Sequence, residues 1–306
     1  MPEALVDRIP LGSVGQKTLA AFNQSDELLC VKDLCTEFRG AREIVAVKHA
    51  NFHIAPGEVL GLVGESGCGK SVLVKSLIRI LPPNGYISGG QILWLGENLC
   101  SASERRMREI RGSDISIIFQ NPQASLNPAR SIGSQLNSLI HSKMRCSGQE
   151  AARRSLDLLE KVRLPDPGRV MGLYPFECSG GMCQRVLIAM ALAGSPKLLI
   201  ADEPTTSLDV TIQAQIIRLI LDLKNDLGMS ILFVSHDLSL VSCICDRVAV
   251  MFQGRIVETA SARELFQAPR HSYTKTLLES SVAFRLGETE LSHGPPPRSP
   301  IRANEP

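Results

Sequence analysis

The sequence lacks any apolar segment long enough to cross a membrane. None of its apolar runs approaches the roughly 18 residues that a transmembrane helix requires. Near the N-terminus, Asp7, Arg8 and Pro10 interrupt the region where a secretory signal peptide would need continuous apolar residues. We therefore expect any association with a membrane to depend on partner proteins.

The chain also has little net charge and no paired cysteine motif. The formal net charge of +2 provides no overall field that would attract nucleic acid or an anionic membrane. The nine cysteines form no C-x-x-C pair of the kind found in zinc sites, and scattered thiols indicate a reduced, cytosolic protein. With 306 residues, 44% of them hydrophobic, the chain can bury a substantial core.

The most informative motif is a glycine-rich loop that fits the phosphate-binding pattern G-x-x-x-x-G-K-[S/T]. It reads Gly64-Glu65-Ser66-Gly67-Cys68-Gly69-Lys70-Ser71. An apolar run at 58–63 predicts a buried strand before it, and residues 72–78 predict a helix after it. In such a loop, backbone N–H groups and the helix N-terminus face phosphate oxygens, the lysine reaches the β and γ phosphates, and the hydroxyl ligates Mg²⁺. The motif predicts binding of a nucleoside triphosphate.

Two acidic residues end a second apolar run. Asp202 and Glu203 follow Leu198-Leu199-Ile200-Ala201, which predicts a buried strand. If this strand shares a sheet with the phosphate loop, Asp202 can hold Mg²⁺ and Glu203 can face an attacking water. Without the phosphate loop, two solvated acids at a strand end would be the simpler interpretation.

A second glycine pair precedes a strongly helical run. Ser179, Gly180 and Gly181 lead into the apolar segment 186–192. A hydroxyl, free N–H groups and a helix dipole together can bind an anion, although the same pattern also serves as a plain helix cap. Because one chain rarely needs two anion sites for one γ phosphate, the pattern suggests contact with a nucleotide held by another subunit.

The chain divides into a core flanked by two less regular ends. Residues 1–26 form a predicted flexible leader, 27–280 a nucleotide-binding domain with a helical subdomain at about 101–175, and 281–306 a predicted disordered tail. Short strand-like runs before residue 100 surround a turn at 39–42, and another strand is predicted at 230–234. A stripe of apolar residues at 212–227 predicts a helix that ends at Gly228. Another predicted helix, at 149–162, places Ala152, Leu156, Leu159 and Val162 on one face.

Taken in order, these motifs resemble the ATPase subunits of ABC transporters. The ordered set comprises the phosphate loop, Gln120, Ser-Gly-Gly-Met-x-Gln, Asp202-Glu203-Pro204, Ser207-Leu208-Asp209 and His236, and the match extends from about Leu29 to Ser281. The resemblance implies an α/β fold, namely a P-loop NTPase core with an antiparallel β subdomain and a helical subdomain. It also implies that two such domains sandwich two ATP molecules.

The resemblance implies a role for each matching residue. Gly64 to Ser71 would bind ATP, with Phe38 stacking on adenine; Ser71, Gln120 and Asp202 would hold Mg²⁺. Glu203 would be the catalytic base, assisted by His236 at the γ phosphate and by Gln120. Ser179, Gly180, Gly181 and Gln184 would contact the partner's ATP, and Ser207 and Asp209 would lie in the dimer-interface loop.

Two further segments resemble the dipeptide, oligopeptide and nickel importers within this family. They are Phe119 to Pro128 and Arg270-His271-Ser272-Tyr273-Thr274-Lys275. Met182 is typical of the first type of ATPase in a heterodimeric pair. The resemblance implies a peripheral protein on the cytoplasmic face of the inner membrane, with a second ABC ATPase, two integral membrane permeases and an extracytoplasmic substrate-binding protein as partners. Peptide is the preferred cargo, with nickel or another small solute as the alternative.

The sequence departs from the family pattern at Asn121, Phe176 and Cys178, none of which would touch a reacting atom. No cysteine follows Cys245, so we expect no iron–sulfur cluster, and we expect no nucleic acid partner. An ABC ATPase acting on DNA or ribosomes is disfavoured, because the chain has one phosphate loop and too short a segment between Lys70 and Ser179 for a long coiled coil. A regulatory subunit without hydrolysis is disfavoured by the presence of both Glu203 and His236.

Overall fold

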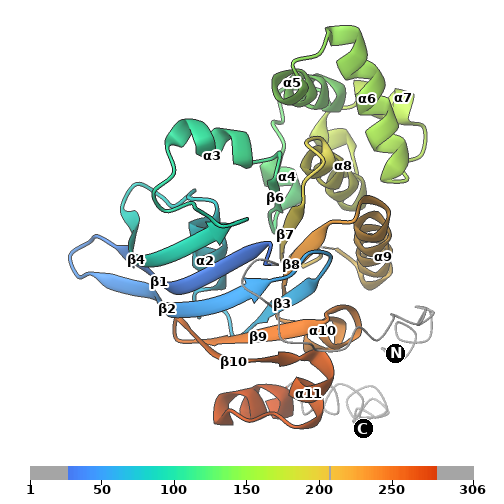
Figure 1. Cartoon of the computed structure of the whole chain (residues 1–306). Helices are drawn as coiled ribbons and strands as arrows, with labels where there is room; N and C mark the ends of the chain where they lie inside the picture. Colours follow the sequence, from blue (N-terminus) through green and yellow to red (C-terminus); the bar gives the residue numbers. More distant parts are fainter. Residues whose placement is uncertain (1–26, 207, 281–306) are drawn as a thin grey trace, which may run out of the picture.

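The computed structural model describes residues 27–206 and 208–280 (Figure 1). The predicted leader and tail, 1–26 and 281–306, lie outside the described residues. Two sheets and a separate group of helices make up the described chain, which confirms the predicted α/β class with an antiparallel subdomain and a helical subdomain. Among the described helices, none is long and apolar enough to span a bilayer.

The smaller sheet is antiparallel and has the strand order β2-β1-β4-β5. Its strands are β1 (Leu29–Phe38), β2 (Ile44–Ile54), β4 (Gly85–Trp94) and β5 (Glu97–Asn98). Burial alternates along much of β1, as expected for a strand with one face on the core. The predicted turn at 39–42 joins β1 to β2, so this part of the sequence analysis is confirmed.

The larger sheet carries the nucleotide motifs and has the order β10-β9-β3-β8-β7-β6. Its strands are β3 (Val59–Val63), β6 (Ile115–Ile118), β7 (Leu198–Asp202), β8 (Ser230–Val234), β9 (Arg247–Phe252) and β10 (Arg255–Ser261). All neighbours pair in parallel except β10, which is antiparallel to β9. Strands β3, β7 and β8 are buried at every position, and this explains their continuous apolar runs.

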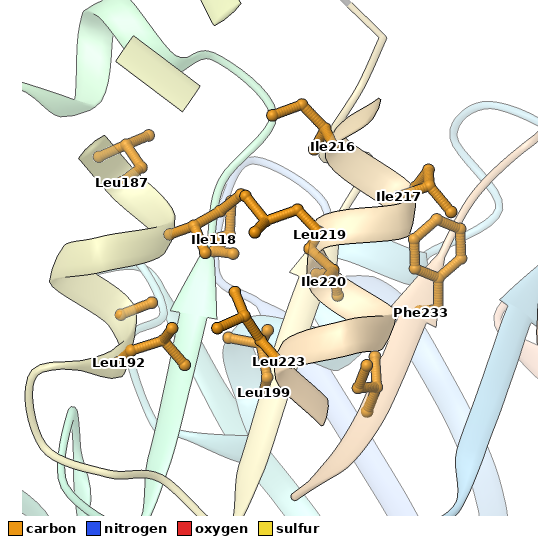
Figure 2. Packing of buried hydrophobic residues seen from close by; sticks show 14 of the residues in the cluster. Ile118, Leu187, Leu192, Leu199, Ile216, Ile217, Leu219, Ile220, Leu223 and Phe233 are labelled. Atoms are coloured by element: carbon orange, nitrogen blue, oxygen red, sulfur yellow. The ribbon is translucent and has the colours of Figure 1, made fainter. Parts of the chain in front are cut away.

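Helices pack on the larger sheet and bury its apolar residues. They include α2 (Lys70–Leu77), α8 (Gly180–Leu192), α9 (Val210–Leu227), α10 (Leu238–Ile244) and α11 (Ala262–Gln267). Figure 2 shows Leu223 of α9 near Leu199 of β7, and Ile217 of the same helix near Phe233 of β8. Gly228 ends α9 with a left-handed backbone (φ 64°), which confirms the predicted C-cap.

The helical group stands apart from both sheets, at the upper right of Figure 1. It contains α5 (Ile132–Met144), α6 (Gly148–Lys161) and α7 (Pro167–Gly172), which follow the short α4 (Pro122–Ser125). The predicted range of 101–175 is too wide, because β6 lies within it and pairs with β7 in the core sheet. A strand of four residues is too short for its pattern of apolar residues to be distinguished from that of the helices around it in the sequence.

The buried face of α6 also differs from the prediction. Ala151, Ser155 and Leu159 are its buried residues, whereas Ala152 and Leu156 are only half-buried. The difference arises because Ser155 is polar, yet its hydroxyl donates to Asn137 of α5 at 2.6 Å. A buried serine with a partner costs little and carries no apolar signal.

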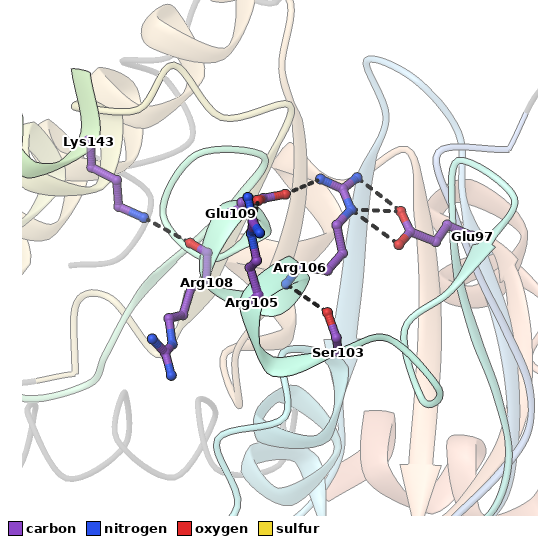
Figure 3. Close-up of polar contacts among 7 residues, drawn as sticks. All are labelled: Glu97, Ser103, Arg105, Arg106, Arg108, Glu109 and Lys143. Atoms are coloured by element: carbon purple, nitrogen blue, oxygen red, sulfur yellow. Dashed lines mark hydrogen bonds and ion pairs between the residues drawn. The ribbon is translucent and has the colours of Figure 1, made fainter. Parts of the chain in front are cut away.

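Lys143 joins the helical group to the core. It lies in the last turn of α5, and its ammonium contacts the carbonyl oxygens of Arg108, at 3.5 Å, and of Arg111. These carbonyls belong to the C-terminal end of α3 (Glu104–Ile110), as Figure 3 shows for Arg108. A cation at a helix C-terminus pairs with carbonyls that have no partner within the helix.

Replacing this lysine tests the junction. Lys143→Met keeps the length of the side chain and removes its charge, leaving the α3 carbonyls without their donor. We expect the free energy of unfolding in urea to fall by about 1–2 kcal/mol. Lys161→Met is the matched control, because Lys161 is exposed on α6 and has no hydrogen bond or ion pair within the described residues. Equal stabilities of the two variants would contradict the junction.

Candidate functional site

Three parallel strands bring the predicted nucleotide residues to one edge of the larger sheet. Strand β3 runs into the phosphate loop, β7 ends at Asp202, and β8 leads to His236. The register places Val234 beside both Leu62 and Asp202, and the backbone N–H of Glu203 donates to the carbonyl of Val234 at 3.0 Å. Carboxyl ends of parallel strands form the binding edge of open α/β sheets.

The phosphate loop follows a backbone path that requires glycine at two positions. Gly64 has φ 151°, and a Cβ there would lie 2.2 Å from the carbonyl oxygen of Met251. Gly69 has φ 112°, and its Cβ would lie 2.6 Å from the carbonyl oxygen of Ala46. Any side chain at either position would collide with backbone that cannot move aside. Glu65, Ser66 and Gly67 are exposed, which leaves the tip of the loop open to a ligand.

Lys70 points back into the loop. It begins α2 and is only 6% exposed. Its ammonium donates to the carbonyl oxygens of Gly64, at 2.6 Å, and of Glu65, at 2.9 Å. Cys68, within the loop, is buried, and burial raises the pKa of its thiol. A buried ammonium held inside a ring of backbone groups is suited to bind the phosphates of a nucleotide.

Asp202 has the properties of a ligand for a hard cation. It is 6% exposed, and its Oδ1 atom has no hydrogen-bond partner among the described residues. Burial raises its pKa, whereas the Ser71 hydroxyl and nearby lysines act in the opposite direction. A buried carboxylate oxygen without a donor is costly unless a cation binds it.

Ser71 and Asp202 together fit Mg²⁺. Mg²⁺ usually takes one or two protein carboxylates and completes its shell with water and substrate phosphates. Within residues 27–206 and 208–280, no group of three or more His, Cys, Asp or Glu side chains is arranged around a metal position. A site of one carboxylate and one hydroxyl therefore needs the nucleotide to complete it.

Glu203 is the point where the predicted catalytic residues meet. Its Oε2 accepts hydrogen bonds from Gln120 Nε2 at 2.8 Å and from the Thr206 hydroxyl at 3.1 Å. Its Oε1 lies 3.4 Å from His236 Nδ1. The residue itself has φ 49°, a left-handed backbone that is uncommon outside glycine and that recurs at functional sites.

Sequence reasoning missed Thr206. The signal was available in its spacing, because a hydroxyl three residues after Glu203 in a turn can reach back to that carboxylate. The turn Pro204-Thr205-Thr206 makes this contact possible.

The second glycine motif caps α8. The Ser179 hydroxyl accepts from the backbone N–H of Met182 at 3.3 Å. A Cβ at Gly181 would lie 2.9 Å from a methyl group of Ile212, so glycine lets α8 approach α9. Ser179 is exposed, and no hydrogen bond within the described residues joins it to the Glu203 group. The structure thus leaves this motif separate from the chain's own phosphate loop.

One residue of that motif is buried. Gln184 is 0% exposed, and both its amide atoms lack a hydrogen-bond partner in the described part of the chain. A side chain without exposed surface cannot contact a nucleotide held by another subunit in this conformation. The inward face of α8 carries Gln184 into the core in this arrangement, and its contact with the partner's ATP stays a prediction.

The structure describes two of the three remaining predicted residues, Phe38 and Asp209. Phe38 is half-buried at the end of β1 and packs against Gly85, where a Cβ would lie 2.9 Å from its ring. Asp209 is exposed and caps α9 by accepting from the backbone N–H of Ile212 at 3.0 Å. Ser207 lies outside the described residues.

Comparison with known proteins gives a consistent result. The ABC transporter family profile matches residues 47–206. The chain is 51% identical over 266 residues to "Probable peptide ABC transporter ATP-binding protein y4tR" of Sinorhizobium fredii, covering 86% of this chain and 79% of that protein. It is 48% identical over 275 residues to the oligopeptide transport ATP-binding protein OppD of Bacillus subtilis, covering 88% of this chain and 77% of that one.

Solved structures agree with the fold. The dimeric post-hydrolysis structure of the ATP-binding cassette MJ0796, bound to ADP and Pi, has a TM-score of 0.69 and 26% identity. The alignment covers 77% of this chain and 99% of that one.

The burial of the Asp202 charge, with one oxygen that lacks a hydrogen-bond partner among the described residues, predicts a gain in stability when the charge is removed. Because the folded pKa is raised above the unfolded value, folding stability falls as pH rises through the folded pKa, and the cost remains at neutral pH. Asp202→Asn should therefore raise the free energy of unfolding of the nucleotide-free chain at pH 7 by about 1 kcal/mol. The same variant should lose the extra stability that Mg²⁺ with ATP gives the wild type.

Urea denaturation with and without Mg²⁺ and ATP measures both effects. Asp226→Asn is the control, since Asp226 is exposed on α9 and far along the helix from its N-terminus. An Asp202→Asn chain that is less stable than the wild type, or that Mg²⁺ and ATP still stabilise equally, would contradict the metal site.

Proposed function

Because this chain belongs to the ABC transporter family of ATP-binding subunits, we propose that it powers the import of peptides through partner membrane permeases. The observation that carries the proposal is the Glu203 carboxylate, held by Gln120, Thr206 and His236 beside the phosphate loop. The names of the relatives support peptide as the cargo. The identity of the relatives over most of the chain extends this support to residues outside the nucleotide site.

ATP binds with its phosphates against the loop from Gly64 to Ser71. The backbone N–H groups of the loop and the Lys70 ammonium neutralise the β and γ phosphates, and Phe38 contributes a surface for the adenine. Ser71, Asp202 and Gln120 would hold Mg²⁺, which would supply positive charge to the phosphates of the nucleotide. Lys70 and Ser71 begin α2 and Asp202 ends β7, so these three groups are held by regular structure and need little reorganisation on binding.

Glu203 acts as the general base. Its carboxylate accepts a proton from water as the water oxygen bonds to the γ phosphorus, and the bond from that phosphorus to the β–γ bridging oxygen breaks. Gln120 and Thr206 orient the carboxylate, and His236 lies on its other oxygen, where it can face the γ phosphate. Proton transfer by a positioned base contributes roughly 10²–10⁴ in rate.

The second subunit completes the site. Ser179, Gly180 and Gly181 form a helix N-terminus, exposed at Ser179, that serves the nucleotide of the partner. ATP then bridges two subunits and favours the closed pair over the open one, because its contacts are complete only on closure. The segment from Gln120 to Asn127 links the catalytic carboxylate to the helical subdomain, and it carries this motion to the permeases.

The assembly that follows has four kinds of component. The chain pairs with a second ABC ATPase on the cytoplasmic face of the inner membrane. Two permeases provide the path, and an extracytoplasmic binding protein delivers the cargo. Met182 favours a heterodimer, since it places this chain with the first of two ATPase types.

Neutralising the base tests the chemistry. Glu203→Gln keeps the size of the side chain and its hydrogen-bonding contacts but removes the proton acceptor, so ATP binding should persist while turnover falls by at least ~100-fold. Phosphate release by the purified transporter gives turnover, and calorimetry gives ATP affinity. Glu160→Gln, at an exposed position on α6, is the control. Turnover of the Glu203→Gln complex near that of the wild type would exclude Glu203 as base.

Purification of the complex tests the biological role. A tagged Glu203→Gln chain, isolated from native membranes with ATP and Mg²⁺, should carry two permeases and a second ABC ATPase, identified by mass spectrometry. The binding protein encoded with those permeases would then be tested for peptide affinity by calorimetry. Recovery with ribosomes or DNA-repair proteins and without permeases would contradict import, and a binding protein specific for nickel would contradict the peptide cargo.

A further inference from the structure

The segment Arg270-His271-Ser272-Tyr273-Thr274-Lys275 has no part in the reaction described above. It follows α11, and helical residues run from 272 to 280. Tyr273 and Thr274 are buried, whereas Ser272, Lys275 and Thr276 are exposed. The side of this helix that carries Tyr273 and Thr274 therefore packs against the rest of the protein.

The start of the segment is fixed to the edge of the larger sheet. The Glu258 carboxylate, on β10, accepts from the backbone N–H groups of Arg270 at 2.8 Å and His271 at 3.0 Å. Although partial burial acts in the opposite direction, hydrogen bonds from residues 270–274 lower the pKa of Glu258. His271 Nδ1 in turn accepts from the backbone N–H of Tyr273 at 3.1 Å. These bonds set the position of Tyr273.

The Tyr273 side chain reaches from this anchor to the phosphate loop. It is 8% exposed, and its ring stacks on Phe252 with centroids 4.0 Å apart and an angle of 29°. Its hydroxyl oxygen accepts a hydrogen bond from the backbone N–H of Glu65 at 3.1 Å. The tyrosine thus connects the end of β9 to the second residue of the loop.

The peptide unit between Gly64 and Glu65 is held at both ends. Its carbonyl oxygen accepts from the Lys70 ammonium at 2.6 Å, and its N–H donates to the Tyr273 hydroxyl. Lys70 also serves the phosphates in the proposed reaction. Tyr273, unlike Lys70, therefore contacts this peptide unit without a further role in the proposed reaction.

The rest of the loop is braced by the same region of the chain. The backbone N–H of Gly254, in the turn between β9 and β10, donates to the carbonyl of Cys68 at 2.9 Å. Gly64 approaches the carbonyl of Met251 at the end of β9 so closely that no Cβ would fit. Strand β9, the turn that follows it and Tyr273 therefore all contact the loop.

The geometry assigns Tyr273 as a positioning residue for nucleotide binding: its hydroxyl fixes the peptide unit 64–65, and thereby the direction of the loop N–H groups that face phosphate. This assignment rests on the proposed function, since it concerns the same ATP site. Preorganised N–H groups bind phosphate well because they do not have to be ordered at the moment of binding. Without the hydroxyl, the N–H of Glu65 loses its protein acceptor and the loop samples other directions.

Tyr273→Phe removes this contact and little else, because the ring and its stacking on Phe252 remain. We expect the Kd for a non-hydrolysable ATP analogue with Mg²⁺, measured by calorimetry on the full chain, to rise about five- to tenfold, the loss expected for one hydrogen bond. In the assembled transporter, KM for ATP should rise by a similar factor while kcat stays within about twofold, since Glu203 and its partners are untouched. The urea midpoint should stay near that of the wild type.

Thr276→Val is the matched control. It removes a hydroxyl from the same helix, but within the described part of the chain that hydroxyl bonds only to the carbonyl of Ser272, at 3.3 Å. Wild-type affinity in this control together with weakened binding in Tyr273→Phe supports the positioning role. Unchanged affinity in Tyr273→Phe would overturn it, as would equal losses of affinity and stability in both variants. If the wild-type chain binds no ATP, the proposed function is overturned. The wild-type measurement shows this independently of the two variants.

Discussion

The parallel pairing of β3, β8 and β7 is the constraint on which the site depends. It fixes the ends of three strands, far apart in the sequence, at one edge of a sheet. The phosphate loop, Asp202 and His236 each follow directly from a strand end. A shift of one residue in this register would turn alternate side chains to the opposite face and separate the carboxylates from the loop. The positions of the reacting groups are therefore determined by the pairing of these strands.

Two features at this edge of the larger sheet lower the stability of the folded chain, and the buried core compensates for them. Asp202 keeps a buried carboxylate oxygen that no donor of the described residues reaches, and Glu203 adopts a left-handed backbone. Either feature alone costs of the order of 1–3 kcal/mol. Both persist because β3, β7 and β8 are buried at every position, under helices such as α9, and cannot relax independently. Strain at the site and rigidity beneath it are two parts of one arrangement, as in other preorganised active sites.

The sequence was sufficient where a motif follows a strongly apolar strand. The phosphate loop was located from its glycine and lysine spacing between two apolar runs, and the Asp202–Glu203 pair from the apolar run that it ends. It was insufficient where contacts are made across the fold. Gln184 is polar but buried, the four residues of β6 show no period of their own, and Thr206 acts through a turn that no apolar pattern marks. Tyr273 was noted only as part of a family-like segment, since its contact with Glu65 spans 208 positions.

The most direct test of the account is a structure of the full Glu203→Gln chain with ATP and Mg²⁺. The account predicts the γ phosphate beside Lys70 and His236, the ion on the Ser71 hydroxyl and the Asp202 carboxylate, and residue 203 facing the γ phosphorus. It also predicts that Ser179 of one subunit contacts the nucleotide of the other. A nucleotide bound away from the ends of β3 and β7, or an ion that does not touch Asp202, would contradict the account.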